Sequence, residues 1–329
     1  MVTQQDVADR AGVGRRTVSH VVTGFPHVSP EARERVLRAI DELGYVPNRA
    51  AQQLRTGRSG VIALSVPQIG VGYFGELGAL LIEEAASRGL GLLIGQTLGS
   101  RDRESVEIER ILALQPEGMI LSPLGLTAAD VEQIAARTPV TLIGEHFIGH
   151  DIPGVGESIV IDNVRGSLEL VRHLAQSGRR RVAYVGMPAE VAPRFDALRR
   201  EGTYAGRAAE GLEPVADLLT ADYTWEEGYR VGREAAHRVA AGELDAVSCV
   251  TDEVAIGVMR ALHDAGLRIP TDVAVAGSDG IPEGLRANPR LTTVAPDKVE
   301  LARRAVAAVI GEPVPEGFVP HRVVLREST

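Results

Sequence analysis

The sequence contains one cysteine and no long apolar run. Cys249 alone among 329 residues excludes an internal disulfide and a cysteine-rich metal site, and is typical of a reducing cytoplasm. The chain has neither an apolar N-terminal segment nor 18 consecutive apolar residues. We therefore expect no signal peptide and no membrane span, and predict a cytoplasmic protein.

The sequence also lacks the spacing signatures of common catalytic sites. Its eight histidines are scattered, and it contains no H-E-x-x-H, no G-x-S-x-G and no Walker loop. Isolated histidines such as His173 and His263 fall on expected amphipathic helices, where packing or surface positions are the simplest interpretation. We predict a binding protein rather than an enzyme, with no catalytic residues, no metal and no cofactor.

Positive charge is concentrated near the N-terminus. Residues 1–60 hold nine arginines against six acidic residues, whereas the remainder holds 26 basic and 38 acidic residues. This asymmetry indicates a basic arm on an acidic body. The small excess does not by itself argue for nucleic acid, and two such arms in a dimer would increase affinity.

The basic arm is predicted to contain three short helices. Val7, Ala8 and Ala11 recur at helical spacing, and Gly12 allows a tight turn before a second helix near Arg15. Ser29 and Pro30 open a third helix that ends at Gly44. Two helices joined by a glycine turn fit a helix-turn-helix, although a generic pair of packed helices fits them equally well.

The second helix has an outward polar face. Val18, Val21 and Val22 lie on its inward side. The positions left at its start and outer face, which enter the major groove in a helix-turn-helix, are Arg15, Arg16, Thr17, Ser19 and His20. Arginine bonds bidentately to guanine, whereas hydroxyl groups suit phosphate oxygens. We therefore predict that Arg15, Arg16 and His20 read bases.

A fourth segment begins at Pro47 and Asn48. Residues 49–54 are too short and too polar to form a stable helix alone, so we expect a hinge helix that folds against DNA and a partner chain. Leu54 is a large apolar residue flanked by glutamines and an arginine, a composition that suits a wedge inserted between base pairs from the minor groove. The alternative is an ordinary linker leucine.

The body alternates expected strands and helices. Strands are predicted at 61–66, 90–94, 118–121, 140–143, 182–185, 218–219, 246–250 and 273–276. Helices are predicted at 76–88, 105–114, 128–136, 166–177, 199–210, 225–241 and 253–266. Short strands separated by such helices indicate two α/β lobes with parallel sheets. A ligand is expected in the gap between the lobes, at the carboxyl ends of the strands.

The loop after the first strand contains a G-x-G-x-x-G motif at residues 70–75. This motif would suggest a dinucleotide enzyme. Three residues separate the strand from Gly70, and the second strand ends without the carboxylate that binds a ribose hydroxyl. A dinucleotide site is therefore the weaker interpretation.

The whole chain resembles the lactose-repressor/galactose-repressor (LacI/GalR) family. The matching positions are Asp6-Val7-Ala8, Ala11-Gly12-Val13, Thr17-Val18-Ser19, Gly24, Val28-Ser29, Arg33, Arg35-Val36, Ala39-Ile40, Glu42-Leu43-Gly44-Tyr45 and Pro47-Asn48. The resemblance implies a three-helix helix-turn-helix head over 1–46, a hinge helix over 47–58, and a two-lobed periplasmic-binding-protein-like core over 59–329. The first lobe is expected at about 59–160 plus 293–318, and the second at about 161–292 plus 319–329.

The resemblance also implies two sets of contact residues. The DNA-contacting set is Thr3, Arg15, Arg16, Thr17, Ser19, His20, Asn48 and Leu54. The effector-contacting set is Tyr73, Phe74, Glu145, Arg199, Tyr223, Thr251 and Asp279. Many relatives carry arginine at the position of His20, asparagine at that of Thr251 and aspartate at that of Gly144. Here Glu145 would take the place of that aspartate. The other interpretations are a surface arginine at Arg199 and helix N-caps at Asp252 and Asp279.

These features predict a homodimeric transcriptional regulator. The resemblance implies a repressor of carbohydrate-utilisation genes that binds double-stranded operator DNA and responds to a small-molecule effector, a sugar by family frequency. A purine-responsive regulator of the same fold stays open. A periplasmic solute-binding protein would share the core but needs an export signal and has no DNA-binding head.

Overall fold

The computed structural model describes residues 2–329 except 23–24, 47–57, 71 and 157. Contacts divide the chain into two compact units, residues 1–59 and 60–329. Within the described residues, no helix is long and apolar enough to span a membrane.

The N-terminal unit contains the three predicted helices, α1 (Gln4–Ala11), α2 (Arg15–Val22) and α3 (Pro30–Leu43). Their ends are fixed by local hydrogen bonds. Thr3 and Asp6 form a reciprocal capping box at α1, and Ser29 caps α3 in front of Pro30. The helices pack around a small apolar core of Val7, Ala8, Ala11, Val18, Val21, Val36, Ala39 and Tyr45.

The first lobe of the larger unit is built on a parallel sheet. Its strand order is β2 (Gly91–Gln96), β1 (Val61–Val66), β3 (Met119–Leu121) and β4 (Val140–Leu142). The helices of this lobe are α5 (Gly72–Ser87), α6 (Arg101–Leu112), α7 (Ala128–Ala135) and α13 (Lys298–Val309). Separate apolar clusters are centred on Leu64, with α5 and α13, and on Met119, with α6 and α7.

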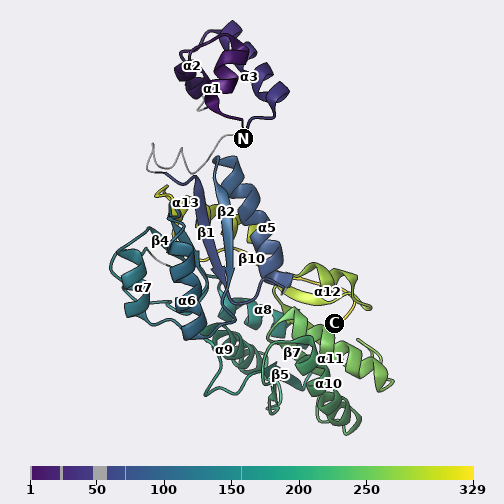
Figure 1. Ribbon diagram of the computed structural model, residues 1–329. Coiled ribbons are helices and arrows are strands. Elements are labelled where there is room, and N and C mark those ends of the chain that lie inside the picture. The colour runs from purple at the N-terminus through teal and green to yellow at the C-terminus, as the bar shows by residue number, and fades with distance from the viewer. Residues whose placement is uncertain (1, 23–24, 47–57, 71, 157) are drawn as a thin grey trace. The chain divides into compact units, whose positions relative to one another are not determined.

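The second lobe is built on a larger sheet (Figure 1). Its strand order is β10 (His321–Val324), β9 (Thr292–Pro296), β8 (Ala274–Ser278), β7 (Ala246–Cys249), β5 (Val182–Gly186) and β6 (Leu218–Leu219). Pairing is parallel except between β9 and β10. The helices are α8 (Asn163–Gln176), α9 (Arg194–Ala209), α10 (Trp225–Ala240), α11 (Asp252–Asp264) and α12 (Pro282–Arg286).

Glycines allow two helices of the second lobe to pack closely. A Cβ on Gly228 in α10 would lie 2.3 Å from the backbone oxygen of Val254, and a Cβ on Gly257 in α11 would lie 2.2 Å from that of Trp225. No side chain fits at such distances, so α10 and α11 meet backbone to backbone. This packing positions the loops before both helices, which carry Tyr223 and Thr251.

One expected lobe boundary differs from the structure. The predicted first lobe resumed at residue 293, but Thr292–Pro296 is β9 in the second sheet. The return to the first lobe therefore begins with α13, a helix that was not predicted from the sequence. Thr292 and Thr293 are fully buried polar residues, so β9 lacks the apolar pattern of a core strand.

Candidate functional site

The N-terminal unit presents a polar helix face. Arg15 and Arg16 are exposed at the start of α2, and Thr17, Ser19 and His20 are partly exposed, whereas Val18 and Val21 are buried. This is the division that the apolar spacing predicted. A helix N-terminus carrying two arginines attracts phosphate and leaves the arginine forks free to reach base edges.

Two of the predicted DNA contacts also have structural partners. The Thr3 hydroxyl accepts a hydrogen bond from the backbone nitrogen of Asp6 at 3.3 Å, so it caps α1. The His20 ring lies 4.5 Å from the Phe25 ring, between centroids. Asn48 and Leu54 lie outside the described residues. Their DNA contacts stay predictions.

A cavity of about 520 Å³ lies between the two lobes of the core. Its walls come from loops that follow β1, β2, β3, β4, β6, β7 and β8, and from the N-terminal parts of α5 and α9. These loops meet because the carboxyl ends of parallel strands share one edge of each sheet. The predicted effector residues Tyr73, Phe74, Glu145, Arg199, Tyr223, Thr251 and Asp279 all line this cavity. Their contacts with a ligand stay predictions.

The first-lobe wall is largely apolar. Tyr73 and Phe74 stand edge to face with ring centroids 5.2 Å apart, at the start of α5. The G-x-G-x-x-G loop therefore delivers an aromatic pair to the cavity. Leu98, Leu124, Ile143 and Ile159 extend the apolar surface.

Glu145 is the buried carboxyl group of the first-lobe wall. It accepts a hydrogen bond from the backbone nitrogen of Ile161 at 3.3 Å. Burial raises the pKa of Glu145, and the nearby charge of Arg199 opposes the rise. The site thus holds a buried carboxyl group whose ionised form is supported by the nearby charge of Arg199.

Arg199 is the centre of the second-lobe wall. Its Nη2 lies 2.9 Å from Oδ1 of Asp279, and its Nε donates to Oδ1 of Asn163 at 2.8 Å. Its Nη1 donates to the carbonyl oxygen of Val250 at 2.5 Å. Burial alone would lower the pKa of Arg199, but Asp279 and Glu145 outweigh it, and the pKa lies above the usual value. Arg199 is therefore a buried, charged wall residue, not a surface arginine.

Asp279 is held in an unfavourable backbone conformation. Its φ angle is 117°, which is unusual for a residue other than glycine. Burial raises the pKa of Asp279, and the charge and hydrogen bond of Arg199 counteract that effect. Such strain is found at functional positions when the surrounding contacts compensate for it. The N-cap of α12 is Ile281, so an N-cap role for Asp279 is excluded.

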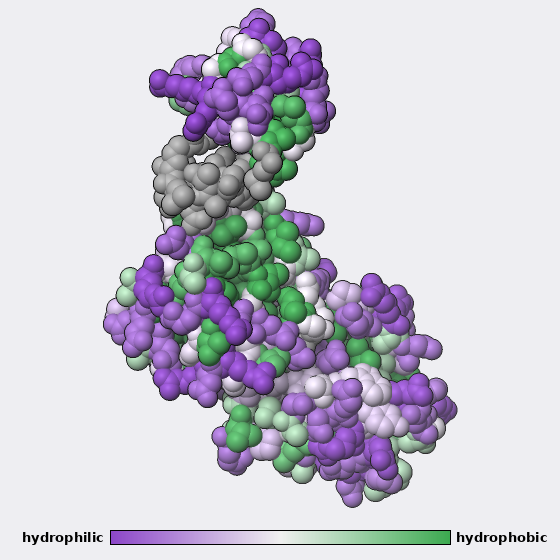
Figure 2. All heavy atoms as spheres, viewed as in Figure 1, coloured by the Kyte–Doolittle hydropathy of each residue, from purple (hydrophilic) through white to green (hydrophobic). Residues whose placement is uncertain are grey.

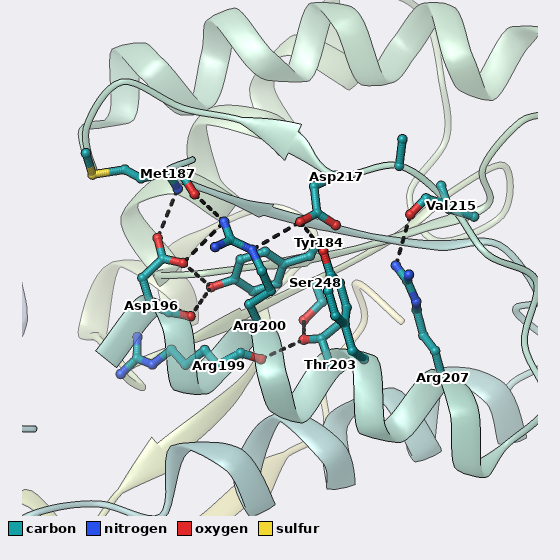
Figure 3. A network of polar contacts seen from close by, with 12 residues as sticks. Tyr184, Met187, Asp196, Arg199, Arg200, Thr203, Arg207, Val215, Asp217 and Ser248 are labelled. Carbon is teal, nitrogen blue, oxygen red and sulfur yellow. Dashed lines mark hydrogen bonds and ion pairs between the residues drawn. The ribbon is translucent and has the colours of Figure 1, made fainter. Parts of the chain in front are cut away.

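A polar network lies behind the second-lobe wall (Figure 3). The fully buried Asp196 accepts hydrogen bonds from the hydroxyl groups of Tyr184 and Tyr223, both at 3.0 Å, and from the backbone nitrogen of Met187 at 2.9 Å. Nη2 of Arg200 lies 3.6 Å from Oδ1 of Asp196. Tyr223 therefore lines the cavity with its hydroxyl group already bonded to Asp196.

The expected cap at α11 is corrected by the structure. Thr251, not Asp252, is the N-cap, because its side chain accepts a hydrogen bond from the backbone nitrogen of Val254 at 3.3 Å. Asp252 is buried and accepts hydrogen bonds from the backbone nitrogen of Ile281 at 2.9 Å and the hydroxyl of Thr293 at 2.6 Å. Burial, followed by the charge of Asp279, raises the pKa of Asp252 to about 8.

Several residues in or next to the cavity walls were not predicted from the sequence. Phe195 precedes Arg199 by one helical turn, and its ring lies 5.1 Å from that of Tyr223. Helical spacing from Arg199 was the signal that would have found it. Asn163 has no local signal, because it reaches Arg199 across the fold. Asp222, Glu226 and Glu253 also line the cavity. Within the described parts of the chain, no group of three or more His, Cys, Asp or Glu residues is arranged to hold a metal.

A helix-turn-helix unit and a two-lobed core with a cavity between its lobes define a ligand-responsive transcriptional regulator. Residues 3–48 match the model of bacterial regulatory proteins of the lacI family, and residues 171–329 match that of a periplasmic binding protein-like domain. The chain is 33% identical to the HTH-type transcriptional regulator CelR of Thermobifida fusca, with 98% of this chain and 95% of that protein covered. The chain belongs to the LacI family.

Solved structures agree with this assignment. The lac repressor dimer bound to operator and the anti-inducer ONPF is similar with a TM-score of 0.80 and 26% identity, over 99% of this chain and 98% of that one. The complex of CelR with cellobiose is similar with a TM-score of 0.68 and 27% identity, over all of both chains. The expected fold, a helix-turn-helix head and a periplasmic-binding-protein-like core, is confirmed.

Proposed function

We propose that the protein is a homodimeric repressor of carbohydrate-utilisation genes, whose affinity for operator DNA is changed by a sugar bound between the core lobes. The observation that carries this proposal is the cavity of about 520 Å³, which combines rings and apolar side chains on one wall with Arg199 and Asp279 on the other. A sugar ring needs such a site, because its C–H faces are apolar and its hydroxyl edge is polar.

The relatives support the sugar and DNA assignments. One solved neighbour is a CelR–cellobiose complex, and another is a lac repressor dimer on its operator. Asp279 suits adjacent hydroxyl groups, because one carboxylate offers two acceptor oxygens. The aromatic walls would also stack a purine, so nucleosides belong in any ligand screen.

The head is proposed to read DNA through α2. Arg15, Arg16 and His20 are assigned to base edges, and Thr17 and Ser19 to phosphates. Asn48 and Leu54 are assigned to the hinge, with Leu54 as the minor-groove wedge. In a dimer, two heads would read the halves of a near-palindromic site in successive major grooves.

An exposed apolar surface on the first lobe supports dimer formation. Ile82 of α5 is 48% exposed, Ile94 of the edge strand β2 is 40% exposed, and Val106 of α6 is 53% exposed. Figure 2 shows apolar residues gathered over β1, β2 and α5. A contiguous apolar surface is typical of a protein interface.

Effector control requires unequal binding to two arrangements of the lobes. A ligand shifts a conformational equilibrium only by the difference between its affinities for the two states. The cavity walls come from both lobes, so a bound sugar gains its full contacts only when both walls reach it. The arrangement it favours would then set the state of the hinge and the heads.

The test is DNA binding by the full chain, measured by fluorescence anisotropy on the duplex upstream of its own gene. We expect Arg15→Ala and Arg16→Ala each to weaken specific binding by about 1–3 kcal/mol, because each removes a bidentate base contact. Arg172→Ala, in the core, is the matched control and should leave binding unchanged. Unchanged specific binding by both head variants would contradict the assigned interface.

A further inference from the structure

The charges around the cavity are strongly unbalanced. Among the described lining residues, the arginines are Arg194 and Arg199, and the carboxyl groups are Glu145, Asp222, Glu226, Glu253 and Asp279. We propose that this cavity selects uncharged or cationic effectors and rejects anionic ones, such as sugar acids and sugar phosphates. The inference rests on the proposed function, since it names the charge class of the ligand bound there.

The buried arginine is already neutralised. Three of the five N–H groups of Arg199 are directed at Asp279, Asn163 and the carbonyl oxygen of Val250. Asp279 pairs with Arg199 directly at 2.9 Å, and the charges of Asp279 and Glu145 both favour the protonated form of the guanidinium. An incoming carboxylate or phosphate would therefore compete with carboxyl groups for a cation that is in place before the ligand arrives.

The buried part of the cavity lining carries two carboxyl groups against this one guanidinium. Glu145 is 7% exposed and Asp279 is 8% exposed, so neither is well screened by water. A ligand anion beside them would add a further negative charge in a region of low dielectric constant, which is strongly unfavourable. Ligand hydroxyl groups, in contrast, donate hydrogen bonds to both carboxyl groups, and an ammonium group would also balance their charge.

The exposed and half-buried residues of the cavity lining also carry an excess of negative charge. Asp222 and Glu226 are exposed, Glu253 is half-buried, and Arg194 is the only arginine among the described residues there. An acidic opening lowers the local concentration of anions and raises that of cations. The nearby cation of Lys298 does not compensate, because its Nζ contacts Glu76 at 2.5 Å and the carbonyl oxygen of Gly280 at 3.1 Å.

The first test uses matched ligands and the full-length protein at pH 7.5. Melting temperatures are measured with glucose, glucosamine, glucuronate and glucose 6-phosphate, with the same four forms of galactose, with cellobiose and cellobionate, and with adenosine and AMP. We expect a neutral or amino member to raise the melting temperature and its acidic counterpart to bind at least tenfold more weakly. An acid or phosphate that binds as tightly as its neutral counterpart would overturn the proposal.

A charge variant identifies the cause of that selectivity. Glu145→Gln keeps the shape of the side chain and removes its charge, so we expect the gap between the neutral and the acidic ligand to narrow about tenfold. Glu132→Gln removes an exposed carboxylate of α7 outside the cavity and is the matched control. Equal selectivity in wild type and Glu145→Gln would contradict the role of Glu145.

The second test needs no ligand, because Trp225 is the only tryptophan of the chain and lies between the lining residues Thr224 and Glu226. At low salt, we expect caesium to quench its fluorescence more than iodide does, relative to N-acetyltryptophanamide, and the difference to vanish at high salt. Stronger quenching by iodide would refute the acidic opening. If no sugar or nucleoside binds while caesium quenches preferentially, the proposed effector class is wrong and only the acidic opening is supported.

Discussion

The two walls of the cavity are built in opposite ways. The first-lobe wall is mostly apolar, with the Tyr73 and Phe74 rings and one buried carboxyl group, Glu145. The second-lobe wall is a hydrogen-bonded structure in which Arg199 and Asp196 hold side chains from several elements. The polar groups of the second-lobe wall are thus held in place before a ligand binds. The apolar first-lobe wall, in contrast, gains most of its contacts when it covers a ligand.

The largest expected effect comes from breaking the buried ion pair of the second-lobe wall. Arg199→Ala leaves Asp279 and Glu145 in a buried site without their cation, so we expect unfolding to become easier by about 3–5 kcal/mol. Denaturant titration measures the change. Arg172→Ala, which removes a half-exposed partner of Glu210, should cost less than about 1 kcal/mol. Similar losses in both variants would mean that the second-lobe wall is not prearranged.

Removing the acceptor behind Tyr223 should have the next largest effect. Asp196→Ala removes the carboxylate that accepts from the Tyr223 hydroxyl and from the Met187 backbone nitrogen. The Tyr184 hydroxyl keeps the carbonyl oxygen of residue 196 as an acceptor, at 3.1 Å. We expect a loss of about 2–4 kcal/mol in unfolding free energy, because two donors lose their acceptor and Arg200 loses one carboxylate partner. Tyr223→Phe keeps the ring and removes one hydroxyl, so its cost should be about 1 kcal/mol. An Asp196→Ala loss no larger than that of Tyr223→Phe would contradict the network.

Asp252 is expected to make the stability of the protein depend on pH. Burial raises its pKa from 3.8 to about 8, so the folded protein holds a proton that the unfolded chain has released. Stability should therefore fall as pH rises from about 4 to about 8, with no further loss from this group above that range. Asp252→Asn should show a shallower fall in melting temperature over the same range. Parallel curves for the two proteins would contradict the raised pKa.

The sequence predicted the head and the positions of the cavity residues better than the exact elements. Capping residues such as Ser29 and Gly44 mark helix ends locally, and they lie where expected. Helix α5 begins at Gly72 rather than at residue 76, because glycines hide the helical pattern of its first turn. Helix α9 begins at Arg194 rather than Arg199, directly after Pro193.

Other features depended on contacts across the fold. Asn163 is far from Arg199 in sequence and is joined to it only by the tertiary structure. Strand β9 escaped prediction because its buried threonines bond to distant polar groups, such as Asp252 and Ser328. Buried polar residues whose hydrogen-bond partners are distant in sequence do not produce the periodic apolar pattern from which a strand is predicted.

The most direct test of the account compares ligand control of DNA binding in wild type, Arg199→Ala and Arg199→Lys. Each is assayed by anisotropy on the duplex upstream of its own gene, with and without the panel member that raises the wild-type melting temperature most, at a temperature where melting curves show it folded. We predict equal DNA binding without ligand, a ligand-induced change of at least about tenfold in wild type, equivalent to about 1.4 kcal/mol, and almost none in the variants. A full ligand response in both variants would contradict the assignment of this cavity as the control site.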